Sequence, residues 1–128
     1  MSKLIKGIHH VALKCGSDAE FEKTMSFYTE VLGLEVKRSW AAGAMIDAGD
    51  FLMELFREGK VCGCTGAINH FAFAVENVDE LTEKIRAAGY AITKEPTDIC
   101  IPSEPPLPAR IAFCVGPVGE EIELFCEK

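Results

Sequence analysis

Several features that would place a protein in a membrane or outside the cell are missing from this sequence. No apolar run approaches the roughly 20 residues that a membrane-spanning helix requires. The first 7 residues contain no long hydrophobic segment and no small-residue cleavage site, which are the marks of a secretory signal. We therefore expect a cytoplasmic protein that does not bind membranes.

Positive charge is also scarce. The chain has 13 lysines and arginines against 20 aspartates and glutamates, which gives a formal net charge of −7. Nucleic acids and anionic membrane surfaces attract proteins through an excess of positive charge. Neither is therefore an expected partner.

The 6 cysteines do not form the pattern of a disulfide framework or of a zinc site. The only close pair is Cys62 and Cys64, and no second close pair completes a four-thiolate site. Cys15, Cys114 and Cys126 stand in apolar stretches, where a cysteine behaves as a small hydrophobic residue. We expect mostly inert thiols in a reducing compartment.

What the sequence does contain is an internal repeat. With 128 residues, 48% hydrophobic and 26% charged, it has the size and composition of one globular domain, residues 1–128. Ile8–Leu13 matches Ile68–Phe73, and Glu54–Phe56 matches Glu123–Phe125. Each half therefore carries one histidine and one glutamate at matched positions.

The first half is predicted to form a strand, a helix and three further strands. Alternation of polar and apolar residues indicates a strand over 7–15. Ser17–Glu20 has the form of a capping box that opens a helix, and Gly33 is expected to end it. Apolar residues recur along this helix at a spacing that lets one face cover a sheet. The remaining strands are expected at 34–37, 44–47 and 51–56.

The second half repeats this order. A strand over 67–75 precedes a second capping signature at Asn77–Glu80, and a glycine is expected to end the helix. Leu81, Ile85 and Ala88 are expected to face the core. The strands that complete this half are expected at 90–93, 109–115 and 121–126.

These elements predict an α+β fold of two βαβββ modules, at about residues 5–58 and 66–128. The matched histidines are 60 residues apart and the matched glutamates 69, so the second module carries an insertion. The proline-rich stretch 96–108 supplies it. Such a long loop is either a lid over a site or a surface excursion without consequence.

Four residues occupy the matched polar positions of the repeat: His10, Glu54, His70 and Glu123. Neutral imidazoles and carboxylates are good ligands for a divalent metal. Because alternate side chains of a strand share a face, each histidine lies beside small alanines, which leave room for a metal and a substrate. Each glutamate stands inside an apolar strand, where a carboxylate must be paired, protonated or metal-bound.

Taken singly, these residues have ordinary explanations as packed histidines and solvent-facing glutamates. Their matched positions in both halves favour a metal site instead. In the repeat, His9 aligns with Asn69, whereas His10 aligns with His70. We therefore expect His9 on the opposite face of the strand, in a structural role.

The sequence resembles the vicinal-oxygen-chelate superfamily, which includes glyoxalase I, methylmalonyl-CoA epimerase, extradiol dioxygenases, and fosfomycin and bleomycin resistance proteins. The resemblance covers nearly the whole chain and rests on four stretches: Ile8–Ala12, Phe27–Leu34, Ile68–Phe73 and Glu121–Phe125. The Phe-Tyr-x-x-x-Leu-Gly-Leu motif of the second stretch is highly typical of the superfamily. The resemblance implies that the two modules form a cupped, mixed β-sheet around a divalent metal.

Within this superfamily, the second ligand position distinguishes the members. Glutamate there is typical of bacterial glyoxalase I and matches Glu54, whereas epimerases usually have glutamine. Bleomycin-binding proteins lack the metal ligands. Basic side chains that remain for a glutathione carboxylate are Lys14, Arg38 and Arg110.

The resemblance implies a metal-dependent, glyoxalase I-like lyase or isomerase that acts on a small molecule, a 2-oxoaldehyde–thiol hemithioacetal formed with a thiol such as glutathione. One nickel, cobalt, zinc or manganese ion would stabilise an enediolate while Glu123, with Glu54 as the second carboxylate, moves the proton next to the carbonyl. A homodimer is also expected. The alternatives are a methylmalonyl-CoA epimerase-like isomerase and a non-catalytic binding protein for a metal, an antibiotic or another small molecule.

Overall fold

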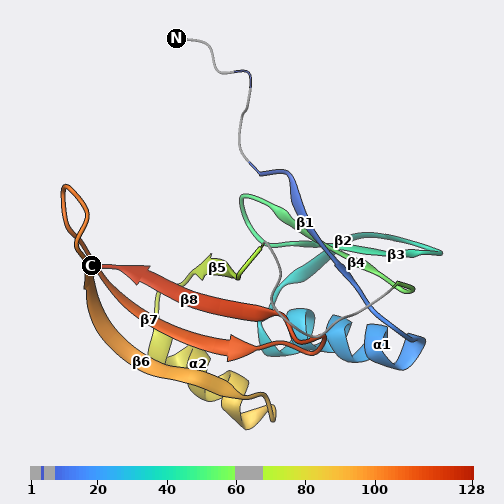
Figure 1. Cartoon of the computed structure of the whole chain (residues 1–128). Coiled ribbons are helices and arrows are strands. Elements are labelled where there is room, and N and C mark those ends of the chain that lie inside the picture. Colours follow the sequence, from blue (N-terminus) through green and yellow to red (C-terminus); the bar gives the residue numbers. More distant parts are fainter. Residues whose placement is uncertain (1–3, 5–7, 60–67) are drawn as a thin grey trace. The chain divides into compact units, whose positions relative to one another are not determined.

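Figure 1 shows the computed structural model of the chain, which describes Leu4 and residues 8–59 and 68–128. The chain divides into two compact units, residues 1–61 and 62–128. Each unit contains one helical segment and a four-stranded sheet, so the predicted α+β fold of two βαβββ modules is confirmed. The stretch between the two predicted modules, at about residues 59–65, lies almost wholly outside the described residues.

The first unit contains a sheet with strand order β1-β4-β3-β2. β1 pairs with β4 in parallel, and the other neighbours are antiparallel. After β1 the chain forms the helical segment and then adds β2, β3 and β4 in turn. The last of these, β4, lies beside β1. The elements of this unit are β1 (His10–Lys14), α1 (Asp18–Ser26), η1 (Phe27–Val31), β2 (Glu35–Trp40), β3 (Gly43–Asp47) and β4 (Leu52–Phe56).

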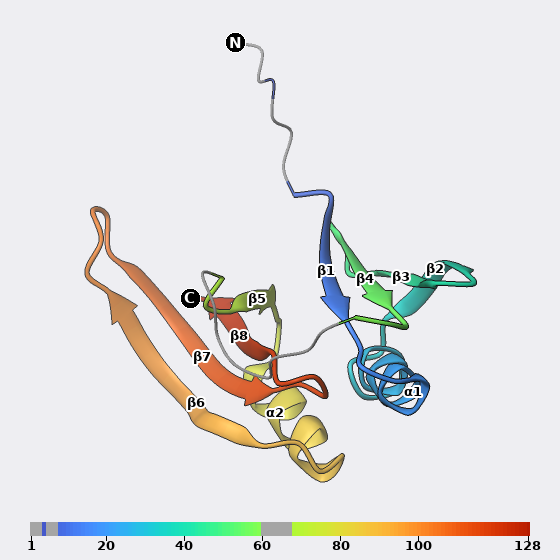
Figure 2. The same cartoon turned by 45° about the vertical axis from the view of Figure 1, so that its right-hand side comes forward.

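The second unit repeats the topology with strand order β5-β8-β7-β6, again with a parallel pair, β5 and β8. β6 and β7 form a long, curved hairpin, which Figure 2 shows from the side. The elements are β5 (Phe71–Ala74), α2 (Val78–Ala87), β6 (Ile92–Ile101), β7 (Leu107–Val115) and β8 (Glu121–Glu127).

Both helices begin at the predicted caps. The Ser17 hydroxyl accepts a hydrogen bond from the Glu20 backbone N–H at 3.1 Å, and the Asn77 side chain accepts one from the Glu80 N–H at 3.0 Å. These contacts satisfy donors that the first turn of a helix leaves without an intrahelical partner. In the described part of the chain, no helix is long and apolar enough to cross a membrane.

The helical segment of the first unit ends in a π-helical turn. The Leu32 N–H donates to the Phe27 carbonyl five residues earlier at 3.0 Å. The rings of Phe27 and Tyr28 are fully buried and pack edge to face with their centroids 5.0 Å apart. Gly33 follows with a φ of 76°, a left-handed conformation that favours glycine and ends the segment. The Phe-Tyr-x-x-x-Leu-Gly-Leu motif thus forms the junction between helix and sheet.

Two expectations about the second module are wrong. The helix buries Val78, Thr82 and Ile85, whereas Ala88 is exposed, because α2 ends at Ala87 and the chain turns away there. The stretch 96–108 is mostly strand rather than loop, since β6 runs to residue 101 and β7 begins at residue 107. Pro96 is accommodated because β6 is an edge strand and its pairing with β7 is irregular between residues 94 and 97.

The buried thiol of Cys114 agrees with the expectation of inert cysteines. Burial raises its pKa to about 12, so the unreactive protonated form prevails at neutral pH. Cys62 and Cys64 lie outside the described residues.

Candidate metal centre

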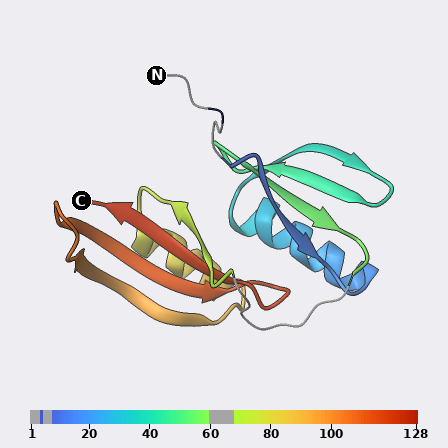
Figure 3. The same ribbon diagram turned by 45° about the horizontal axis from the view of Figure 1, so that its top comes forward.

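Each sheet has one face against its own helix and a second face on which the predicted ligands lie. Figure 3 shows both helices along the covered faces of their own sheets. In β4, Met53 and Leu55 are fully buried, and the alternation of the strand turns Glu54 the other way. In β8, Ile122 and Leu124 are buried in the same way on either side of Glu123.

The first unit brings His10 and Glu54 together. Ala12 of β1 is the register partner of Glu54, and His10 lies two residues before Ala12 on the same face of the sheet. The His10 Nε2 atom is 3.5 Å from the Glu54 Oε1 atom. The Glu54 side chain is 12% exposed and the His10 ring 41%, so the imidazole is more accessible to solvent than the carboxylate.

The second unit brings His70 and Glu123 together in the same way. Ala72 of β5 is the register partner of Glu123, and the His70 Nε2 atom is 3.2 Å from the Glu123 Oε1 atom. The exposed fractions are again low for the carboxylate, at 11%, and higher for the ring, at 34%. Phe113 of β7 packs edge to face against the His70 ring with centroids 5.2 Å apart. The repeat in the sequence is therefore also a repeat of side-chain geometry.

The donor atoms of both pairs fit a divalent cation. A cation about 2.1 Å from a nitrogen and an oxygen separates them by about 3.0 Å at an octahedral right angle and about 3.4 Å at a tetrahedral angle. The observed separations of 3.2 and 3.5 Å lie close to this range. No group of three or more potential ligands is found within the described residues. Each unit supplies one histidine and one glutamate.

The position predicted for His9 is wrong. Its ring lies against the His10 ring, with the two Nδ1 atoms 2.9 Å apart and the ring planes nearly perpendicular. β1 begins at His10, so the alternation of strand faces does not extend back to His9. In the second unit, the matched Asn69 Oδ1 atom is 2.7 Å from the Nδ1 atom of His70. Neither contact was predicted from the sequence. The only signal for them was the alignment of His9 with Asn69 in the repeat.

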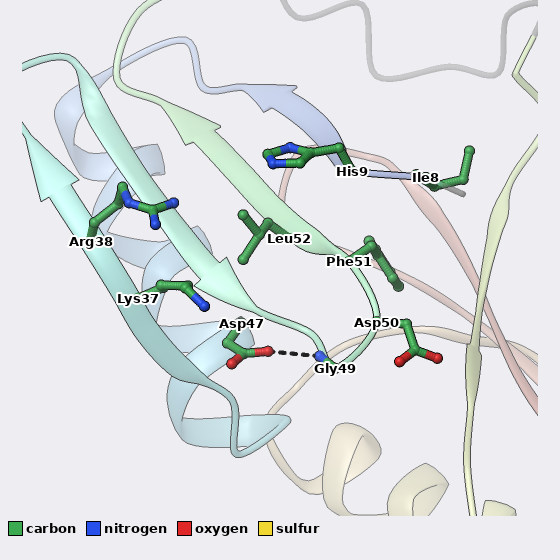
Figure 4. Close-up of a pocket in the computed structure, with 9 residues that line it drawn as sticks. All are labelled: Ile8, His9, Lys37, Arg38, Asp47, Gly49, Asp50, Phe51 and Leu52. Carbon is green, nitrogen blue, oxygen red and sulfur yellow. Dashed lines mark hydrogen bonds between the residues drawn. The ribbon is translucent and has the colours of Figure 1, made fainter. Parts of the chain in front are cut away.

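A pocket lies beside the first pair, and Figure 4 shows the side chains that line it. Its volume is about 1020 Å³. Its lining residues are Ile8, His9, Lys37, Arg38, Asp47, Gly49, Asp50, Phe51 and Leu52. Leu52 is the register partner of His10, so the pocket borders the candidate ligand. Its wall therefore offers cationic and anionic groups around an apolar centre.

Among the described residues, Arg38 is the only arginine that has no carboxylate partner. Its guanidinium contacts the Met45 sulfur at 3.2 Å and remains available to an anionic ligand. Arg110, the other arginine expected near a glutathione carboxylate, is engaged elsewhere. It binds Asp79 of α2 at 2.6 and 2.8 Å and Asp98 of β6 at 3.0 Å, and it lowers the pKa of both carboxyls.

Named relatives are similar to this chain in sequence. A lactoylglutathione lyase of Arabidopsis thaliana is 30% identical over 129 aligned positions, which cover 91% of this chain and 42% of that protein. The chain thus spans less than half the length of this relative. A glutathione transferase of Serratia marcescens, FosA, is 27% identical over 97 positions, covering 72% of this chain and 67% of that protein.

Solved structures share the fold. A putative glyoxalase family protein from Bacillus anthracis superposes with a TM-score of 0.74 at 23% identity and full coverage of both chains. A fosfomycin resistance protein, FosX, from Listeria monocytogenes superposes with a TM-score of 0.75 at 19% identity, covering 98% of this chain and 94% of that one. The model of the Glyoxalase/Bleomycin resistance protein/Dioxygenase superfamily matches residues 7–103, well over half of the sequence. The chain belongs to this superfamily.

Proposed function

We propose that the two His–Glu pairs bind one divalent cation and that the chain is a metal-dependent, glyoxalase I-like lyase or isomerase. The observation that carries the proposal is the matched pair in each unit, with Nε2 and Oε1 atoms 3.5 and 3.2 Å apart. A coincidental pair of polar residues has no reason to recur at the same register of two sheets. Two imidazoles, two carboxylates and two waters make an octahedral set that suits nickel, cobalt, manganese or zinc.

The proposed reaction is a proton transfer at a carbon next to a carbonyl. A bound divalent cation supplies Lewis acidity, which stabilises negative charge on the substrate oxygens. Glu123 accepts the proton from the carbon and returns it to the neighbouring carbon, acting as general base and then as general acid. Glu54 is the second carboxylate and the candidate base if Glu123 serves only as a ligand.

The proposed substrate is a hemithioacetal of a 2-oxoaldehyde with a thiol such as glutathione. Two named relatives, a lactoylglutathione lyase and a glutathione transferase, both have glutathione in their names. Lys37 and Arg38 in the pocket beside His10 supply positive charge for a carboxylate of such a thiol. The glutamate at position 54 favours the lyase over an epimerase, by the resemblance described above.

An activity assay with the metal-loaded protein tests this assignment. Nickel, cobalt, zinc and manganese forms are each given methylglyoxal with glutathione or another thiol, methylmalonyl-CoA alone, and fosfomycin with glutathione. We expect turnover of the hemithioacetal and its loss in His10→Ala and His70→Ala. If methylmalonyl-CoA is the only one of these substrates that reacts, the chain is an epimerase. If fosfomycin is the only one, the chain is a transferase. A protein that binds metal and turns over none of these substrates is a binding protein.

A further inference from the structure

We infer that Asn69 and His9 are positioning residues, which fix the orientation and the protonated nitrogen of the two histidines so that each presents a bare Nε2 atom to the cation. The inference rests on the proposed metal site. In each unit, the residue before the histidine contacts Nδ1, the ring nitrogen on the side away from the glutamate. The two contacts occupy matched positions of the repeat but use different residues.

The contact in the second unit determines which nitrogen of His70 carries the proton. A neutral imidazole has one N–H donor and one bare nitrogen, and an amide oxygen can only accept a hydrogen bond. With the Asn69 Oδ1 atom 2.7 Å away, the Nδ1 atom of His70 must be the donor. The bare nitrogen is then Nε2, which lies 3.2 Å from the Glu123 Oε1 atom. Two lone pairs facing each other at this distance repel unless a proton or a metal cation lies between them.

The contact in the first unit permits the same arrangement at His10. Its Nδ1 atom is 2.9 Å from the Nδ1 atom of His9, so one ring must donate and the other accept. When His9 carries its proton on Nε2, it accepts from His10, whose Nε2 atom is left bare toward Glu54 at 3.5 Å. The perpendicular arrangement of the rings, with planes at 87°, limits rotation of His10.

Such contacts raise the affinity for a metal because they exclude other tautomers and ring orientations of the metal-free histidine. A histidine whose second nitrogen is held by a hydrogen bond needs no change of tautomer or ring angle when the metal binds. Loss of such a partner typically weakens metal binding about 10–100-fold. The chain also offers an internal control. His9 and Asn69 occupy matched positions, so the residue type found in one unit should also function in the other.

The first test measures zinc affinity by competition with a chelator in four variants. Asn69→Leu and His9→Leu remove the hydrogen-bond partner of Nδ1, and we expect each to weaken binding by about 10–100-fold. Asn69→Asp keeps an acceptor oxygen, and His9→Asn imports the partner used in the second unit. Both should bind within a few-fold of the parent. Thermal unfolding of the metal-free variants shows whether each substitution disturbs the fold.

The second test places the proton directly and changes neither positioning residue. In metal-free Glu123→Ala, the carboxylate no longer competes for the His70 proton, so Asn69 alone determines the tautomer. Nitrogen-15 spectra of the ring, at a pH where it is neutral, should show the proton on Nδ1. A proton on Nε2 would overturn the inference, as would Leu and Asp variants of Asn69 that both bind zinc as the parent does. If the parent binds no zinc, the proposed function fails instead, and the spectra alone decide the inference.

Discussion

The two glutamates are withdrawn from water, whereas their histidine partners are not. Glu54 and Glu123 are 12% and 11% exposed, and neither pairs with a lysine or arginine in the described structure. A charged carboxylate at such a position is unfavourable unless a positive charge compensates for it, either a protonated histidine partner or a bound cation. At the scale of single residues, this cost supports the proposed metal site.

Replacement of Glu123 by glutamine separates ligation from proton transfer. The amide keeps an oxygen that can bind a metal, but it cannot accept the substrate proton. We expect Glu123→Gln to retain metal and to lose about 10²–10⁴-fold in kcat, the usual contribution of a general base. Metal content and steady-state kinetics, measured on the same preparation, check this. A variant as active as the parent would assign Glu123 to ligation only, and Glu54→Gln would then be the informative comparison.

At the scale of elements, the helix caps could be predicted from the sequence, whereas the end of α2 and the partners of Arg110 could not. The caps at Ser17 and Asn77 were predictable because each is a contact between residues three positions apart. The exposure of Ala88 follows from where α2 ends, which the apolar spacing did not reveal. The partners of Arg110 lie 31 and 12 residues away in the sequence, so only the fold shows that it is engaged.

The two caps make a matched pair of stability predictions. Ser17→Ala and Asn77→Ala each remove an acceptor for a first-turn N–H of a helix. We expect each to lower the free energy of unfolding by about 0.5–2 kcal/mol and to leave metal binding unchanged. Urea unfolding of the metal-free protein measures the loss. Ser17→Asp and Asn77→Asp, which keep an acceptor, should restore most of it, and failure of that rescue would assign the effect to something other than capping.

The cluster around Arg110 predicts a dependence of stability on pH. A side-chain hydrogen bond from Arg110 lowers the pKa of Asp79 below its ordinary 3.8, and hydrogen bonds from Lys128 and then Arg110 do the same for Asp98. A carboxyl with a lowered pKa in the folded state stabilises it above the unfolded pKa, and this contribution disappears as the pH falls through the folded value. The groups are exposed, so the effect is modest and weakens with salt.

Arg110→Met should therefore be less stable than the parent at neutral pH, and the difference should shrink below pH 3.8. Unfolding by urea at several pH values, at low and high salt, measures it. Arg38→Met is the control, because Arg38 has no carboxylate partner within the described ranges. A difference between Arg110→Met and the parent that stays constant from neutral to acid pH would contradict the electrostatic explanation.

At the scale of the whole molecule, edge strands predict self-association. β2 is an edge of the first sheet, and all of its residues are exposed, including Val36 at 46% and Trp40 at 38%. Edge strands with apolar side chains tend to be covered by a partner, and symmetric homodimers are the commonest assembly. We expect light scattering to give twice the 14.0 kDa mass of one chain at micromolar concentration. A 14.0 kDa species alone would remove this proposal.

The central proposal is that His10, Glu54, His70 and Glu123 hold one divalent cation per chain, and metal stoichiometry tests it most directly. Elemental analysis and zinc titration are performed on the parent and on His10→Ala, Glu54→Ala, His70→Ala and Glu123→Ala. The account predicts one ion per chain in the parent and loss of tight binding in every one of the four variants. Two ions per chain, no ion in the parent, or undiminished binding in any of the four variants would contradict it.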